Sequence, residues 1–209
     1  MTLTTLRDDV RESVTLEDTV RLLSLHVQDK TQHCDTPCRL IAGPQYGGVE
    51  CVGSERKKVY PFVSLVEDDD PLSMIYVRLQ TMDGCDLAFV GLAEFETFVE
   101  ITSDTVPSQR RKHYNTLLRT VAVILAFKMH KPIKSTVTNA WSAYTLLKDY
   151  QTTVRLKQTQ GKHVFMTPLS KDDANDLKAR CGEVYVRPTV DNLQYATRLF
   201  DDATVRCSK

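Results

Sequence analysis

The most regular pattern of apolar and polar positions in the chain lies between residues 108 and 130. Apolar side chains recur there at steps of three and four residues, as the buried face of an amphipathic helix requires. Lys128 and Lys131 suit the negative end of a helix, and Pro132 cannot continue it. The pattern therefore predicts one long helix over residues 108–130. Its buried face consists of Tyr114, Leu117, Leu118, Val121, Leu125 and Met129.

Alternation of apolar and polar side chains predicts strands on both sides of this helix. In the run "SMIYVRLQTM", Ile75, Val77 and Leu79 alternate with other residues, and an Asp-Gly pair signals a hairpin turn after it. Two further β-prone runs precede the helix, and short β-branched runs follow it. The expected strands lie at 73–82, 86–96, 97–106 and 133–138, with two more within 152–168 around a Gln-Gly turn.

Further helices are expected nearer the two ends of the chain. Thr15 is a plausible cap for a helix with Val20, Leu23 and Val27 at helical spacing, and Asn139 is a good cap for a helix over 139–150. The last forty residues are expected to form a helix, the short strand "EVYVRP", the helix "DNLQYATRLFDDA" and a polar tail. The stretch from 31 to 58 mixes Gly, Pro, Cys and charged residues, which predicts an irregular connection.

The order of these elements predicts an α+β fold. A helix is followed by three antiparallel-type strands, the long helix, a strand, a helix and two strands. A strand-helix-strand unit inside a hairpin-rich sheet gives a mixed, mostly antiparallel sheet. We expect residues 1–168 to form the main domain and residues 169–209 to form a C-terminal extension with helices and a short strand.

Charge and cysteine content narrow the classes of function. The 209 residues include 27 Lys and Arg and 27 Asp and Glu, so no chain-wide field for nucleic acid is implied. No signal peptide and no apolar run of about 20 residues is present, which predicts a soluble intracellular protein without a membrane partner. The six cysteines fit no dense disulfide framework. Ordinary reduced cysteines are favoured over a zinc site built from His33, Cys34 and Cys38, because no second ligand pair is present.

A run of four basic residues stands at the expected start of the long helix. It consists of Arg110, Arg111, Lys112 and His113. The start of a helix already carries partial positive charge, so cations there are locally unfavourable. Either the run faces water, or it binds an anion.

The residues around this run resemble the GNAT superfamily of acetyl-CoA-dependent N-acetyltransferases. The segment "PSQRRKHYNTLL" is similar, without a gap, to the family motif P-x-Y-R-G-K-G-I-G-S-x-L-L, and "STVTNAWSAYTLLKDY" is similar to the second family signature. The resemblance covers roughly residues 14–168 and implies a GNAT-like mixed sheet. His113 and Asn115 stand where the family has glycines, which lie there so that the backbone can approach a phosphate closely.

The resemblance also implies a cofactor and candidate site residues. In the family, amides at the start of the long helix bind the pyrophosphate of acetyl-CoA, and the acetyl group passes to a primary amine by direct attack. A base is often drawn from the preceding strand, here Glu100, and Tyr144 is the candidate acid, although the family position falls on Leu146. The implied cofactor residues are Val106, Arg110, Arg111, Lys112, His113, Tyr114, Asn115, Thr116 and Asn139.

A second interpretation remains open. Because the glycines are replaced and the tyrosine is displaced, the chain is also compatible with a catalytically decayed member of the family. Such a protein would act by binding protein partners or copies of itself, as a structural component of a larger assembly such as a virus or phage particle. The location would then be the virion rather than the cytoplasm.

Overall fold

The computed structural model describes residues 1–43, 48–52, 55–59, 71–137, 153–157, 163–166, 182–186 and 190–207. Its helices are α1 (Leu3–Glu12), α2 (Leu16–Thr31), α3 (Tyr114–Lys128) and α6 (Val190–Cys207), with a short 3-10 turn, η1 (Pro107–Gln109). No described helix combines the length and the apolar character needed to cross a bilayer.

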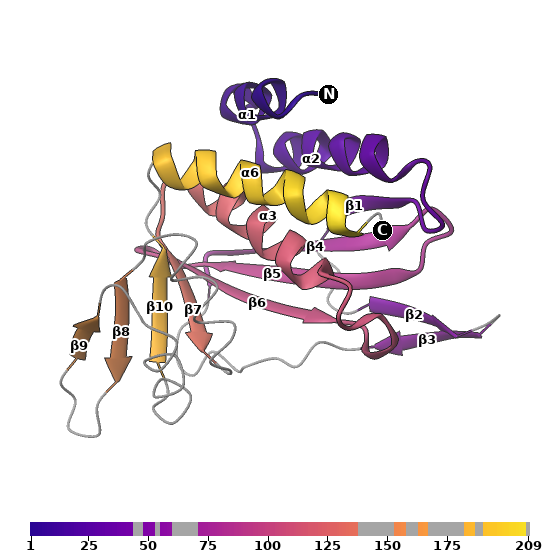
Figure 1. Cartoon of the computed structure of the whole chain (residues 1–209). Helices are drawn as coiled ribbons and strands as arrows, with labels where there is room; N and C mark the ends of the chain where they lie inside the picture. The colour runs from indigo at the N-terminus through magenta and orange to yellow at the C-terminus, as the bar shows by residue number, and fades with distance from the viewer. Residues whose placement is uncertain are drawn as a thin grey trace.

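One mixed sheet forms the base of the fold (Figure 1). Its spatial order is β1-β4-β5-β6-β7-β10-β8-β9, and all neighbours are antiparallel except β6 and β7. This arrangement confirms the expected α+β class and its strand-helix-strand unit. The strands are β1 (Cys38–Gly43), β4 (Ser73–Thr81), β5 (Asp86–Glu94), β6 (Val99–Thr105), β7 (Ile133–Val137), β8 (Thr153–Lys157), β9 (His163–Met166) and β10 (Gly182–Val186).

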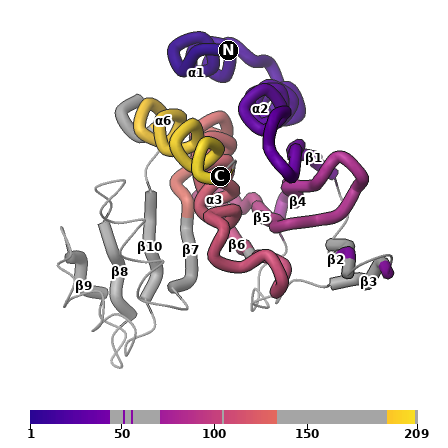
Figure 2. Tube along the Cα trace, turned by 45° about the vertical axis from the view of Figure 1, so that its right-hand side comes forward, coloured from indigo at the N-terminus to yellow at the C-terminus, as the bar shows by residue number. Residues whose placement is uncertain are grey.

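The described helices cover one face of this sheet (Figures 1 and 2). Helix α3 packs on β5 and β6, α2 packs on β1, and α6 lies against α3, α2 and α1. The apolar face expected for the long helix is buried in this layer, including Tyr114, Leu117, Leu118 and Val121. Burial of the α3 stripe between the sheet and α6 therefore forms the centre of the core.

The N-terminal helices begin at threonine caps. The Thr15 hydroxyl accepts a hydrogen bond from the backbone N–H of Asp18 at 3.0 Å, so the predicted cap of α2 is confirmed. Helix α1 was not expected from the sequence, although Thr2 caps it in the same way. It has two buried residues, Leu6 and Val10, which are four positions apart, and this pattern is too short to stand out in the sequence.

The irregular connection expected at residues 31–58 is wrong. The structure places β1 there, together with a separate antiparallel ribbon of β2 (Gly48–Val52) and β3 (Glu55–Val59). These strands have five or six residues each and contain Gly, Cys or charge, so they lack a long alternating pattern. Strand β1 is held by its register with β4, which brings the Cα of Cys38 opposite Thr81.

The long helix also begins later than expected. The predicted start at residue 108 is wrong, because α3 begins at Tyr114 and the basic run lies outside it. At the C-terminus, α6 extends through most of the expected polar tail to Cys207. The helix predicted over 139–150 lies outside the described residues.

The C-terminal segments join the same sheet and helix layer. Strand β10 lies between β7 and β8, and α6 packs on α3. The division at residue 168 stays a prediction, but residues 182–207 contribute to the layers formed by the rest of the chain. Phe200 of α6 is fully buried in the common core.

A buried histidine links the N-terminal and C-terminal helices. His26 of α2 is 0% exposed, and its Nε2 lies 2.8 Å from Oδ1 of Asp201 on α6. Lys30 lies 3.6 Å from the same carboxylate oxygen. Burial lowers the pKa of His26 below its ordinary value of 6.5, and this effect outweighs the attraction of Asp201. The neutral imidazole is therefore the form that the fold prefers.

This preference predicts a pH-dependent stability. Because the folded-state pKa is depressed, the unfolded chain binds the proton first as pH falls below 6.5. We expect the free energy of unfolding to fall with decreasing pH, by up to about 1.4 kcal/mol per unit, until the folded-state pKa is reached. Urea denaturation between pH 7.5 and 5.5 measures this slope.

The matched variants are His26→Gln and His33→Gln. His33 is exposed, so its variant should keep the slope of the unmodified protein. His26→Gln should flatten it. Equal slopes in all three proteins would contradict the assignment of the pH dependence to His26.

Candidate functional site

The parallel strands β6 and β7 separate soon after they begin. Their ladder consists of Val99 opposite Ile133 and Glu100 opposite Lys134. Beyond these positions, no pairing between the two strands occurs in the described ranges, although β6 continues to Thr105 and β7 to Val137. Within the described ranges the two strands therefore diverge toward their carboxyl ends, and we call the region between them the notch.

The chain leaves β6 through a loop that brings the basic run beside this notch. Val106 is buried, and its N–H donates to the carbonyl of Leu87 at 3.0 Å, which fixes the start of the loop on β5. Arg111 and His113 have positive φ angles of 72° and 62°. Left-handed residues turn the backbone sharply, and alternating backbone conformations of this kind can point successive N–H groups into one concavity.

The first turn of α3 is free of side-chain capping. His113 occupies the N-cap position in the left-handed conformation, makes no side-chain capping bond, and is followed by no acidic residue in the first turn. The N–H groups at a helix start have no partner within the helix, so they need water, a side chain or an anion. The start of α3 can accordingly accept an anion.

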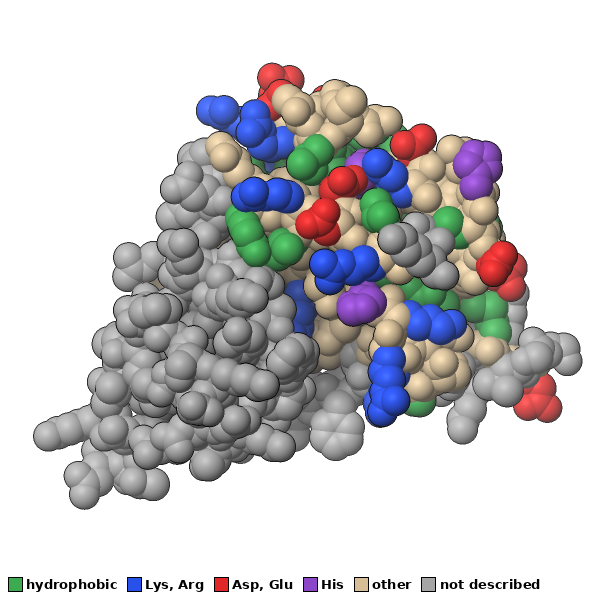
Figure 3. Space-filling model, viewed as in Figure 1, with side chains coloured by type: hydrophobic (Ala, Val, Ile, Leu, Met, Phe, Trp, Pro, Cys, Tyr) green, Lys and Arg blue, Asp and Glu red, His purple; other side chains and the backbone are tan. Residues whose placement is uncertain are grey.

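Positive charge surrounds this helix start. Arg110, Arg111, Lys112 and His113 are all exposed. Figure 3 shows Lys and Arg side chains, with a histidine among them, on the surface over this part of the molecule. Exposed cations that lie just before a helix add their charge to its positive end, which makes the region favourable for phosphate.

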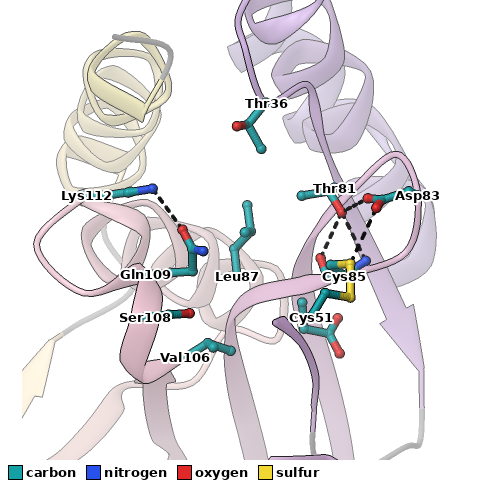
Figure 4. Close-up of a pocket in the computed structure, with 11 residues that line it drawn as sticks. Thr36, Cys51, Thr81, Asp83, Cys85, Leu87, Val106, Ser108, Gln109 and Lys112 are labelled. Atoms are coloured by element: carbon teal, nitrogen blue, oxygen red, sulfur yellow. Dashed lines mark hydrogen bonds between the residues drawn. A yellow bond between two sulfur atoms is a disulfide. The ribbon is translucent and has the colours of Figure 1, made fainter. Parts of the chain in front are cut away.

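The same loop forms one wall of a pocket of about 210 Å³ (Figure 4). Val106, Ser108, Gln109 and Lys112 lie on one side, and Nζ of Lys112 donates to Oε1 of Gln109 at 2.9 Å. Leu87 lies between the walls. The opposite side contains Thr81, Asp83, Cys51 and Cys85, and Thr36 and Asp86 complete the lining.

A disulfide in this pocket overturns one expectation from the sequence. Cys51 of β2 and Cys85 of the turn between β4 and β5 are bonded, with their Cα atoms 5.6 Å apart. The expectation of ordinary reduced cysteines is therefore wrong for this pair. The two residues are 34 positions apart and no local spacing connects them, so only the fold reveals the pairing. Within the described ranges, no group of three or more His, Cys, Asp or Glu side chains is placed to hold a metal.

Two free thiols lie near the loop and stay protonated. Sγ of Cys38 donates to the carbonyl of Thr36 at 3.0 Å, and Sγ of Cys207 donates to the carbonyl of Lys112 at 3.4 Å. Burial raises the pKa of Cys38 to about 11 and the pKa of Cys207 to about 12. The Tyr114 side chain is 3% exposed and belongs to the core, and this burial raises its pKa to about 12.

The structure brings together the part of the predicted site that is continuous in sequence. Residues 106–116 form the loop and the first turn of α3. Glu100 lies six residues earlier on β6, about 20 Å along an extended strand. It occupies the last paired position before β6 and β7 separate, and it is partly buried. Asn139 and Tyr144 lie outside the described residues. The roles of all these residues stay predictions.

Comparisons with known proteins find weak likenesses to solved acetyltransferases. One is a chimera of spermidine N-acetyltransferase SpeG from Vibrio cholerae and hSSAT, with 12% identity over 59% of this chain and 71% of that chain, and a TM-score of 0.37. Another is nourseothricin acetyltransferase, with 14% identity over 77% of this chain and 92% of that chain, and a TM-score of 0.37. A scan against protein-family profiles and a search of curated proteins find no match.

The left-handed conformation of His113 predicts the effect of restoring a glycine. A non-glycine residue in this region costs about 1–2 kcal/mol, and glycine avoids that cost at an entropic penalty of about 0.5–1 kcal/mol. We expect His113→Gly to raise the free energy of unfolding by about 0.5–1 kcal/mol, as measured by urea denaturation.

The opposing variant is His113→Val. A β-branched residue is a true outlier at positive φ, so this change should lower the free energy of unfolding by at least about 1 kcal/mol. A stabilising valine with a destabilising glycine would show that the loop does not hold this conformation.

Proposed function

We propose that this chain is a GNAT-like N-acetyltransferase that binds acetyl-CoA and transfers its acetyl group to a primary amine. The proposal is supported by two features that follow one another along the chain. Parallel strands that separate after Glu100 lead, at the end of β6, to an uncapped helix start behind a basic loop. Together they support a ligand that lies along β6 and places its phosphate at the start of α3.

The residues fit a phosphate at the helix start. The N–H groups of Tyr114, Asn115 and Thr116 belong to the first turn of α3, where no side chain caps them. Favourable charge at a helix start contributes about 0.3–1 kcal/mol, and charge-assisted hydrogen bonds from Arg or Lys add to it. His113 and Asn115 replace the family's glycines, yet His113 already has the left-handed backbone that glycine would provide, and its side chain is exposed.

The divergence of β6 from β7 supports a ligand with a linear arm that carries amide groups. Strand β6 pairs with β5 from Val99 to Thr105, so its other edge is the one that faces the notch. The backbone of a strand that has diverged from its neighbour can hydrogen-bond an extended chain laid beside it. The proposed ligand supplies a thioester, whose carbonyl carbon is the electrophile for an amine.

Glu100 is the proposed general base. A base must stand within reach of the ammonium proton that it removes, and Glu100 lies where the notch begins. The transfer then needs an amine nitrogen to form a bond to the acetyl carbon as the thiolate leaves, and that thiolate needs a proton. Tyr144 remains the proposed acid. The cytoplasm is the proposed location for this activity.

Binding of coenzyme A tests the anion site. We expect calorimetry to detect binding to the unmodified chain, and the double change Arg110→Glu and Lys112→Glu to weaken it at least about tenfold, because both cations are reversed next to the phosphate. The affinity should also fall as salt is added.

The control reverses two cations far from the loop. The double change Arg7→Glu and Arg21→Glu, on α1 and α2, alters the net charge by the same amount as the test variant. It should leave the affinity for coenzyme A unchanged. If the unmodified chain gives no heat at millimolar coenzyme A, the transferase proposal fails. The alternative, a scaffold that acts through protein partners or copies of itself in a larger assembly, then takes its place.

The proposed role of Glu100 is tested by replacing its side-chain carboxylate with the amide of glutamine. Glu100→Gln keeps the shape of the side chain and removes the proton acceptor, so we expect kcat to fall by at least about a hundredfold with little change in the affinity for coenzyme A. Mass spectrometry of acetylated products from a panel of small primary amines provides the rate. Glu96→Gln, at an exposed position, is the matched control. An unchanged rate in Glu100→Gln would assign the base elsewhere.

A further inference from the structure

The β2–β3 ribbon is attached to the rest of the molecule through its first strand. It forms its own two-stranded sheet, separate from the main sheet. Strand β2 contacts β5, and the Cys51–Cys85 disulfide adds a covalent connection to the turn that precedes β5. The disulfide therefore joins two segments that do not share a backbone ladder.

Both cysteines of this disulfide line the pocket beside the basic loop. Neither Cys51 nor Cys85 is fully buried, and the opposite wall of the pocket is formed by Ser108, Gln109 and Lys112 (Figure 4). A disulfide at the wall of an open pocket can be reached by a small thiol, and accessible disulfides are the ones that undergo exchange.

The nearby free thiols are poor candidates to open this bond themselves. Exchange requires a thiolate, and the raised pKa values keep Cys38 and Cys207 protonated near neutral pH. Their sulfurs are also directed to the carbonyls of Thr36 and Lys112. The raised pKa values therefore limit exchange of Cys38 and Cys207 with the disulfide, and a thiol from outside the protein is the proposed attacking group.

We propose that Cys51–Cys85 is a thiol–disulfide exchange site, at which a small dithiol enters the pocket, opens the bond and releases the β2–β3 ribbon. One thiolate of the dithiol attacks a cysteine sulfur, forms a mixed disulfide and displaces the other cysteine as a thiolate. The second thiol of the reagent then attacks the mixed disulfide. The reagent leaves as a cyclic disulfide, oxidised by two electrons, and Cys51 and Cys85 take up its two protons as thiols.

Release of the ribbon has a consequence for the basic loop, and this step rests on the proposed function. Arg56, Lys57 and Lys58 follow one another along β3, and Arg56 occupies the ladder position opposite Cys51. The disulfide thus keeps the strand that carries this basic segment beside the pocket wall that lies opposite Lys112. Removing that segment lowers the local positive potential, so the reduced protein binds phosphate ligands more weakly.

The first experiment measures release of the ribbon. Trypsin cleaves after Arg and Lys, so cleavage at residues 56–58 reports their exposure. We expect native-state cleavage there to be about tenfold faster after treatment with dithiothreitol, and to slow again after reoxidation. The double variant Cys51→Ser and Cys85→Ser should be cleaved quickly with or without dithiothreitol. Cys34→Ser, which removes a thiol outside this disulfide, should behave as the unmodified chain does.

Circular dichroism on each sample separates release of the ribbon from global unfolding. Retained secondary structure with rapid cleavage supports the proposal. Equal cleavage rates before and after reduction, or a disulfide that dithiothreitol does not open in the folded protein, would overturn it. Unfolding on reduction would also overturn it, because the disulfide would then be needed by the whole fold.

The second experiment measures ligand affinity in the two redox states. Calorimetry with coenzyme A should show affinity about threefold to tenfold lower for the reduced protein, as expected when a positively charged segment moves away from an anion site. Equal affinities of the oxidised and reduced proteins, together with rapid cleavage after reduction, would show that release of the ribbon does not affect ligand binding at the basic loop. Absence of binding in both states would instead reject the proposed function, and the cleavage experiment would still decide whether the exchange site exists.

Discussion

The separation of β6 from β7 is the constraint on which the rest of this end of the molecule depends. Two strands that part after two residue positions would normally leave weak edges. Here each strand has an antiparallel partner on its other side, because β5 pairs with β6 throughout and β10 pairs with β7 throughout. The notch is therefore supported by complete ladders on both sides.

The position of the basic run resolves the conflict that the sequence presents. Cations in a first helical turn would oppose the positive end of the helix. The chain avoids this by beginning α3 at Tyr114, so that all four basic residues stand before the helix. Left-handed backbone at Arg111 and His113 makes the required turn without glycine. The basic side chains remain near the helix start, so an anion there would be attracted both by these side chains and by the positive end of the helix.

The features that the sequence predicts well are the local ones. Periodicity identified the buried face of α3, the Thr15 cap identified α2, and alternation identified β4, because each depends on neighbours within a few residues. The part of the candidate site at residues 106–116 could also be proposed from the sequence, because these residues are continuous. The disulfide and the pocket could not be predicted from the sequence, because their residues come from separate segments. The contact of His26 with Asp201 joins positions 175 apart, and no local pattern encodes it.

Lys112 shows how these distant segments determine the conformation of the loop. It follows left-handed Arg111 and precedes left-handed His113, so rotation at Lys112 would shift the start of α3. Its side chain is held by Gln109 in the pocket, and its carbonyl accepts from Cys207 at the end of α6. The C-terminal helix is thus in direct contact with the candidate anion site. Because α6 is also anchored through Phe200 and Asp201, the geometry of the loop depends on packing that extends to α2.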